Sequence, residues 1–171
     1  GFMKKLIIST AFILFASSNT FSQTNSSEVT QELYDLGIID SSGKYINTEL
    51  AAEYFTQATE MLSKSLPVKV NKNIEIYSAL MTPYYSNYAY KINFDLNQSQ
   101  KNIVVQELLS EDSIKEMCDE MFNQQIFWAN DHHMNLRYMD KNYKTIVDVV
   151  LNTKTCKTDV PSTLKSKNIS L

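Results

Sequence analysis

The most constraining feature of this chain is a run at residues 84–97 in which apolar and polar side chains alternate. Aromatic or aliphatic side chains stand at most even positions from Tyr84 to Leu96, and mainly polar side chains stand between them. Successive side chains of a β-strand point to opposite faces of the sheet, so this alternation predicts a long strand with one apolar and one polar face. Such a strand needs a sheet that other elements cover on one side.

The preceding segment, residues 68–82, also alternates. Ile74, Ile76, Ser78 and Leu80 are expected on one of its faces. Pro83 separates the two runs and favours a turn between them. The two runs together therefore predict an antiparallel hairpin.

A first helix is expected before this hairpin. Asn47 or Thr48 can cap its beginning, and the helical spacing continues to about Lys64. Pro67 closes the segment. The predicted apolar stripe consists of Ala51, Tyr54, Phe55, Ala58, Met61 and Leu62.

A second helix is expected to start at Ser110 or Ser113, where Ser113 and Glu116 fit a capping box. The preceding residues, 101–109, are compatible with either a strand or a helix. The predicted apolar stripe of this helix consists of Ile114, Met117, Cys118, Met121, Phe122 and Ile126.

A second hairpin follows in the sequence. Met134, Leu136 and Tyr138 alternate with polar residues, the turn is expected at residues 140–142, and residues 143–151 are rich in β-branched side chains. The element order α-β-β-α-β-β predicts an α+β fold with a mostly antiparallel sheet of about four strands, packed by two main helices.

The beginning of the sequence is typical of an export signal. Lys4 and Lys5 precede an apolar run of about 11 residues, which is too short to span a bilayer, and small residues follow it before Gln23. We expect residues 1–22 to be a cleaved signal peptide, with Gly1 and Phe2 as an artefact. Since no cysteine follows the apolar run, we expect no lipid anchor and a periplasmic or secreted protein.

The expected compartment bears on the two cysteines. Cys118 and Cys156 are 38 positions apart, and an even pair in an exported protein indicates a disulfide. The alternative is a catalytic thiol at Cys118 with His132 or His133 as its base, but no local signature of a thiol enzyme surrounds Cys118.

The remaining segments complete the expected domain organisation. Residues 23–46 are polar and predict a short helix within 28–36, residues 47–156 form the α+β domain, and residues 157–171 form a flexible tail. At 171 residues, the chain is long enough for one domain with a core.

The order of these features resembles a loose group of small exported bacterial proteins. The first feature is the segment of residues 66–70, which leads into Ile74 and Ile76. The others follow in chain order: the run Tyr88, Ala89 and Tyr90; Cys118; the run Leu136, Arg137 and Tyr138; and Cys156. The resemblance implies a helix–hairpin–helix–hairpin domain closed by one disulfide, and it supplies no active site. Most members have no assigned function. The sequence departs from the pattern in the second turn, which has Asn142 where a glycine is expected.

Candidate functional residues fall into three groups. Asp131 and His133 are weak candidates for a metal site, and a solvated loop is the better interpretation of residues 131–133. Tyr77, Tyr84 and Tyr85 could form an exposed patch for a protein, peptide or sugar, whereas Tyr88 and Tyr90 are expected to pack under a helix. The acidic residues near a helix start that could contact a basic partner are Glu111 and Asp112.

These observations favour a protein without catalytic activity. The net charge of −3 argues against nucleic-acid binding, and the sequence has no phosphate-binding glycine loop and no zinc-protease or redox-cysteine motif. We predict a protein-interaction domain without a cofactor, and one version of it is an immunity or inhibitor protein against a secreted toxin or hydrolase. The alternatives are an accessory factor of a secretion or surface-assembly system, and a small hydrolase or metal-dependent enzyme that uses His132 or His133.

Overall fold

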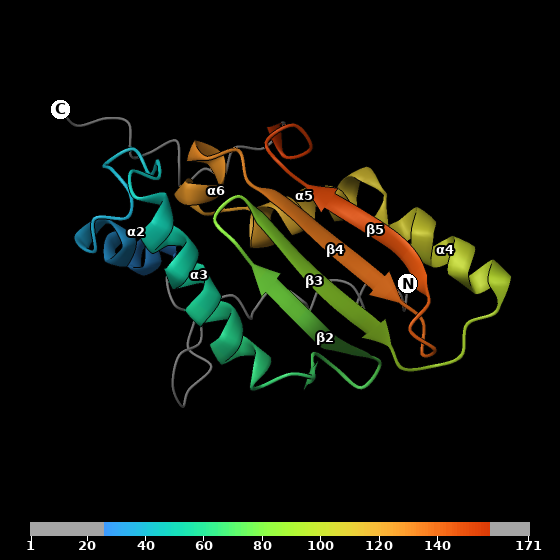
Figure 1. Cartoon of the computed structure of the whole chain (residues 1–171). Helices are drawn as coiled ribbons and strands as arrows, with labels where there is room; N and C mark the ends of the chain where they lie inside the picture. Colours follow the sequence, from blue (N-terminus) through green and yellow to red (C-terminus); the bar gives the residue numbers. More distant parts are fainter. Residues whose placement is uncertain (1–25, 158–171) are drawn as a thin grey trace.

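The computed structural model describes residues 26–157 (Figure 1). The predicted signal peptide, residues 1–22, lies outside this range, and so does the predicted tail beyond residue 157. Within the described range, no helix is both long and apolar enough to cross a membrane.

The sheet has five strands in the order in which they occur along the chain. They are β1 (Val68–Lys69), β2 (Ile74–Met81), β3 (Tyr85–Ile92), β4 (His133–Met139) and β5 (Thr145–Leu151). Neighbouring strands are antiparallel except for the parallel pair β3–β4, because a helical crossover connects these two. The fold is α+β with a mostly antiparallel sheet, as the sequence predicts.

The fifth strand arises because residues 68–82 fold back on themselves instead of forming one strand. Val68 of β1 lies opposite Ile76 of β2. The side-chain oxygen of Asn71 accepts hydrogen bonds from the backbone N–H groups of Asn73 and Ile74, at 2.8 and 3.0 Å. This local turn is where the prediction of one continuous strand was wrong.

A β-bulge interrupts β2 at Tyr77. Ile76 pairs with Tyr90 and Ser78 with Ala89, so Tyr77 is an extra residue in β2. The bulge shifts the alternation by one position, and Leu80 is 46% exposed although Ile74 and Ile76 are buried. The prediction that these three side chains share one face was therefore wrong.

The helices are α2 (Ser26–Asp35), α3 (Thr48–Ser63), α4 (Gln98–Leu108), α5 (Glu111–Met121) and α6 (Gln125–Ala129). Asn47 caps α3, because its side chain accepts a hydrogen bond from the N–H of Leu50 at 3.0 Å. The predicted stripe of α3 includes one error, since Met61 is 52% exposed.

Two helices, α5 and α6, occupy the predicted second helix, and a third, α4, occupies the segment before it. Residues 101–109 belong mostly to α4, which begins at a capping box formed by Asn97 and Gln100. Ser110 caps α5 through the N–H of Ser113, so the capping box predicted at Ser113 was wrong. The helix ends at Met121, and Ile126 lies in α6 instead of extending the stripe of α5.

One face of the sheet is not covered by any of the described helices. Figure 1 shows α4 and α5 behind β4 and β5, and α3 beside β2. The core lies on the helix side, where the rings of Tyr90 and Tyr138 stack with centroids 4.9 Å apart. Tyr88 is also buried there, as predicted. We call the opposite side, which faces the viewer of Figure 1, the outer face of the sheet.

One disulfide joins Cys118 of α5 to Cys156, which follows β5. Their Cα atoms are 5.5 Å apart and both side chains are buried. The predicted disulfide is confirmed, and it leaves no free thiol at Cys118. A crosslink that closes a loop of this length stabilises a fold by roughly 3–4 kcal/mol in the chain-entropy model.

Candidate interaction surface

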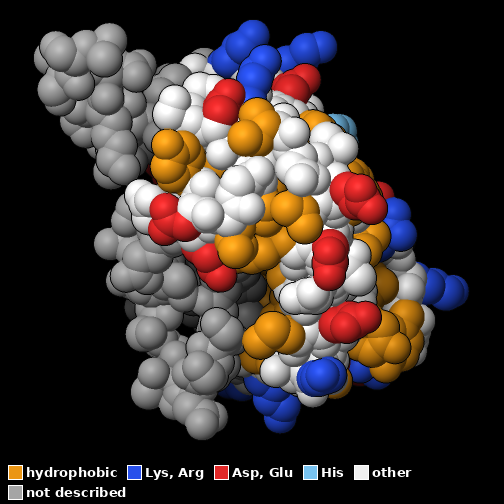
Figure 2. All heavy atoms as spheres, turned by 60° about the vertical axis from the view of Figure 1, so that its left-hand side comes forward, with side chains coloured by type: hydrophobic (Ala, Val, Ile, Leu, Met, Phe, Trp, Pro, Cys, Tyr) orange, Lys and Arg blue, Asp and Glu red, His pale blue; other side chains and the backbone are white. Residues whose placement is uncertain are grey.

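Three large aliphatic side chains are exposed where α2 and α3 meet. Leu36 is 52% exposed, Ile46 64% and Leu50 40%. Figure 2 views this side of the molecule and shows apolar side chains interspersed with acidic ones. We call Leu36, Ile46 and Leu50 the α2–α3 patch.

The end of α2 explains why Leu36 points outward. The N–H of Gly37 donates to Tyr34 and the N–H of Ile38 donates to Leu33, which is the bonding pattern of a Schellman motif with glycine in the left-handed position. Leu33 and Ile38 are both buried by this arrangement. Leu36 lies between them in the sequence, on the outside of the turn.

The beginning of α3 is tied to the same turn. The N–H groups of Ile46 and Asn47 both donate to the carbonyl oxygen of Ile38, at 3.0 and 3.3 Å. Farther along the two helices, the hydroxyl of Tyr54 donates to Glu32 at 3.1 Å. These bonds fix the two helices side by side, so the patch belongs to a rigid part of the fold.

The charges around the patch differ from those elsewhere in the molecule. Ion pairs such as Lys91–Glu75, Lys101–Asp140 and Arg137–Asp148 connect the strands, their loops and α4. Neither α2 nor α3 contains a lysine or arginine. Within the described residues, the exposed carboxylates of these helices that make no ion pair are Glu32, Asp35, Glu49, Glu53 and Glu60.

The three tyrosines predicted as a patch are exposed but occupy different places. Tyr77 is 44% exposed in the bulge of β2. Tyr84, at the β2–β3 turn, stacks edge-on against Tyr45 with centroids 5.3 Å apart. Tyr85 lies over His133, with ring centroids 6.0 Å apart. The structure brings Tyr84 and Tyr85 to one end of the hairpin and leaves Tyr77 near its middle.

Glu111 and Asp112 lie exposed in the first turn of α5. In this position they complement the positive end of the helix dipole. They belong to the helix layer behind the sheet, whereas Tyr77 contacts the turn between β4 and β5.

His132 corrects the prediction of a solvated loop at residues 131–133. Its side chain is 1% exposed and stacks on Phe127 with centroids 4.5 Å apart. Its Nε2 lies 2.9 Å from the hydroxyl of Ser86, and its Nδ1 lies 3.1 Å from the carbonyl oxygen of Pro83. Burial lowers the pKa of His132 to about 4, so this imidazole is a neutral core group at neutral pH.

Asp131 and His133 are held by other partners. The hydroxyl of Thr153 donates to the carboxylate of Asp131, and His133 is exposed at the start of β4. Within the described residues, no three histidine, cysteine, aspartate or glutamate side chains converge in a way that could hold a metal ion.

Sequence reasoning missed the α2–α3 patch because residues 23–46 are polar in composition. The available signal was local: Leu36 and Ile46 flank a glycine turn and a helix cap, and neither fits the apolar stripe of a helix. Tyr143, described below, was also missed.

No family model and no curated protein matches the sequence. Three solved structures resemble the fold. The pilotin EpsS from the Vibrio vulnificus type 2 secretion system has 12% identity and a TM-score of 0.44, with 64% of this chain and 94% of that chain covered. The type II secretion system pilotin AspS from Vibrio cholerae has 14% identity and a TM-score of 0.42, with the same coverage.

The third structure is a protein of Pseudomonas aeruginosa described as secreted. It has 11% identity and a TM-score of 0.44, with 65% of this chain and 96% of that chain covered. At these identities and TM-scores, the similarity concerns the general course of the chain alone.

Proposed function

We propose that this chain is an exported, non-enzymatic protein that binds another protein through the α2–α3 patch, as an accessory factor of a secretion or surface-assembly system. The observation that supports the proposal is the patch itself, in which exposed aliphatic groups lie on helices whose carboxylates make no ion pair within residues 26–157. The fold similarities described above are not part of this support.

The chemistry of the patch suits a protein partner. Burying exposed aliphatic surface contributes about 25 cal/mol per Å² removed from water, and the surrounding carboxylates form a polar rim. Because these carboxylates make no ion pair with the residues that the structure describes, the matching surface of the partner should be apolar with basic residues at its edge.

The position of the patch suits a docking surface. Leu36 and Ile46 lie in the segment that connects α2 to α3, and backbone hydrogen bonds at Ile38 hold this segment in place. Such a surface is suited to holding a segment of a partner protein.

The test uses the chain from Gln23 onward as bait on envelope and secreted extracts, with mass-spectrometric readout. The variant Leu36→Ser/Ile46→Ser replaces the two most exposed aliphatic side chains of the patch. The matched control is Ile103→Ser/Leu109→Ser, which replaces two aliphatic side chains of similar exposure, 45% and 46%, on and just after α4.

We expect one stoichiometric partner that is a component of a secretion or surface assembly. It should be lost with the patch variant, retained with the control, and bound more weakly at high salt. If the partner is a hydrolase or toxin that loses activity on binding, the protein is an inhibitor and not an accessory factor. A partner that the patch variant still binds, or no partner at all, would contradict the proposal.

A further inference from the structure

Two turns in this protein have the same backbone hydrogen bonds. In the turn at residues 40–44, Asp40 N–H donates to Lys44 and Gly43 N–H donates to Asp40, at 2.9 and 3.0 Å. In the turn at residues 140–144, the equivalent bonds from Asp140 and Tyr143 are both 2.9 Å. In each turn the aspartate carboxylate also accepts two backbone N–H groups, two and four residues further on.

The two turns differ at the residue with positive φ. Gly43 has φ +85°, a conformation that glycine adopts freely. Tyr143 has φ +63°, a conformation that is unfavourable for a residue with a side chain. A bulky residue in this region is rare, and such a strained residue is a reason to ask what its side chain does.

The ring of Tyr143 lies against Tyr77, which a second irregularity exposes. The β-bulge adds Tyr77 to β2, and bulges often redirect a side chain next to a functional site. The two ring centroids are 5.0 Å apart, with a 58° angle between the planes. Tyr143 is 51% exposed and Tyr77 44%, so the pair presents aromatic surface to solvent.

Polar groups of both signs lie beside these rings. The ammonium of Lys91 donates to the hydroxyl of Tyr143 at 3.3 Å and lies 4.6 Å from the centre of its ring. The same ammonium is 3.6 Å from a carboxylate oxygen of Glu75. Lys91 and Glu75 therefore cancel in charge while still offering a hydrogen-bond donor and an acceptor.

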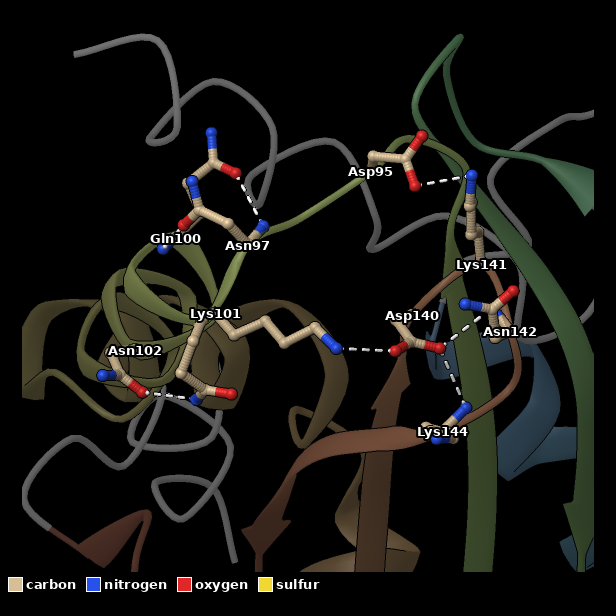
Figure 3. Close-up of polar contacts among 10 residues, drawn as sticks. Asp95, Asn97, Gln100, Lys101, Asn102, Asp140, Lys141, Asn142 and Lys144 are labelled. Carbon is tan, nitrogen blue, oxygen red and sulfur yellow. Dashed lines mark hydrogen bonds and ion pairs between the residues drawn. The ribbon is translucent and has the colours of Figure 1, made fainter.

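The turn that carries Tyr143 is held in place from two sides (Figure 3). Lys101 of α4 donates to the carboxylate of Asp140 at 2.7 Å, and Lys141 pairs with Asp95. The ring position is therefore built into the fold.

We propose that Tyr77, Tyr143, Lys91 and Glu75 form a binding site for a neutral saccharide. A pyranose ring has an apolar C–H face, which can stack on a phenol ring, and hydroxyls at its edge that both donate and accept hydrogen bonds. The compensated pair Lys91–Glu75 can serve such hydroxyls, and because it carries no net charge it gives no electrostatic preference for an anionic or a cationic ligand. This site is separate from the α2–α3 patch and does not rest on the function proposed for that patch.

The experiment titrates the chain from Gln23 onward with chitotetraose, cellotetraose and maltotetraose by isothermal calorimetry. Tyr143→Gly removes the ring and also relieves the backbone strain, so loss of binding in this variant is not a folding defect. Tyr77→Ala removes the second ring. The control is Tyr34→Ala, because Tyr34 is 50% exposed on α2 and lies outside the proposed site.

We expect at least one of the three saccharides to bind, with affinity at least tenfold weaker in Tyr143→Gly and Tyr77→Ala and unchanged in Tyr34→Ala. Thermal unfolding of each variant confirms that it is folded. The proposal is overturned if none of the three saccharides binds, if the Tyr143→Gly variant binds as well as the unmodified protein, or if these rings are instead buried by a protein partner.

Discussion

The turns at residues 40–44 and 140–144 close in the same way but serve different surroundings. At the first, the positive-φ residue is buried, and a Cβ added to Gly43 would lie 3.1 Å from Cγ of Gln125. At the second, the same backbone position is open to solvent and carries Tyr143. The two turns therefore have the same backbone hydrogen bonds, but different causes explain why one has Gly43 and the other Tyr143 at the positive-φ position. Packing demands glycine at one turn, whereas the other turn carries a side chain despite the unfavourable φ.

The largest effect is expected from Gly43→Ala. The new Cβ both requires an unfavourable φ and crowds Gln125, so the free energy of unfolding should fall by about 3 kcal/mol. Chemical denaturation measures the change. Ser42→Ala, in the same turn, is the control and should cost much less. A Gly43→Ala protein as stable as the unmodified one would contradict the claim that packing requires glycine at this turn.

The stability of the protein toward acid is expected to depend on His132 and not on the two turns. The hydrogen bonds to Asp40 and Asp140 lower the pKa of both carboxyls from 3.8, so both turns keep their charge well below pH 5. His132 behaves differently, because its folded pKa of about 4 lies below the unfolded value of 6.5. As the pH falls from 7 to 5, the unfolded chain takes up the proton first, and stability should fall by about 2 kcal/mol.

Denaturation at pH 7 and pH 5 tests this prediction. His132→Gln should remove most of the difference between the two pH values, and His133→Asn should retain it because His133 is exposed. If His132→Gln keeps the full acid sensitivity, the prediction is wrong and a group other than His132 is responsible.

Two substitutions at Tyr143 separate strain from contact. Tyr143→Ala and Tyr143→Gly both remove the ring and its contacts with Tyr77 and Lys91, but only glycine relieves the positive φ. The glycine variant should therefore be more stable than the alanine variant by about 1 kcal/mol, measured by chemical denaturation. Equal stability of the two variants would show that Tyr143 is not strained.

The smallest effect is expected at the exposed ion pair that supports the turn at residues 140–144. Lys141 and Asp95 are 43% and 84% exposed, so water screens their attraction. Lys141→Ala should cost less than about 0.5 kcal/mol, and a double-mutant cycle with Asp95→Ala measures the pair directly. Lys101→Ala should cost more, because its partner Asp140 is only 6% exposed. If Lys141→Ala costs more than Lys101→Ala, the exposed pair Lys141–Asp95 is the main support of the turn.

The sequence predicted the parts of the fold that depend on long patterns. The alternation across residues 84–97 predicted β3 and its buried face, and the spacing after Asn47 predicted α3. The cysteine pair predicted the disulfide. In each case many side chains contribute to one signal, so single irregular positions do not change the result.

The parts that the sequence did not predict depend on one residue or one contact. The bulge at Tyr77, the positive φ of Tyr143 and the burial of His132 each follow from tertiary contacts that no periodicity reports. A glycine was expected where Asn142 stands, whereas the turn needs its left-handed residue one position later. Of the residues proposed for the saccharide site, only Tyr77 was among the predicted interaction residues, and the α2–α3 patch was missed.

The central claim is that the ring of Tyr143 is retained for binding rather than for folding. The most direct measurement is thermal unfolding of the unmodified protein and of Tyr143→Gly, each with and without chitotetraose in excess. A ligand that binds the folded state raises the unfolding temperature. We predict a rise for the unmodified protein and none for the variant, with both proteins similarly stable without saccharide. An equal rise in both proteins, or no rise in either, would contradict the claim.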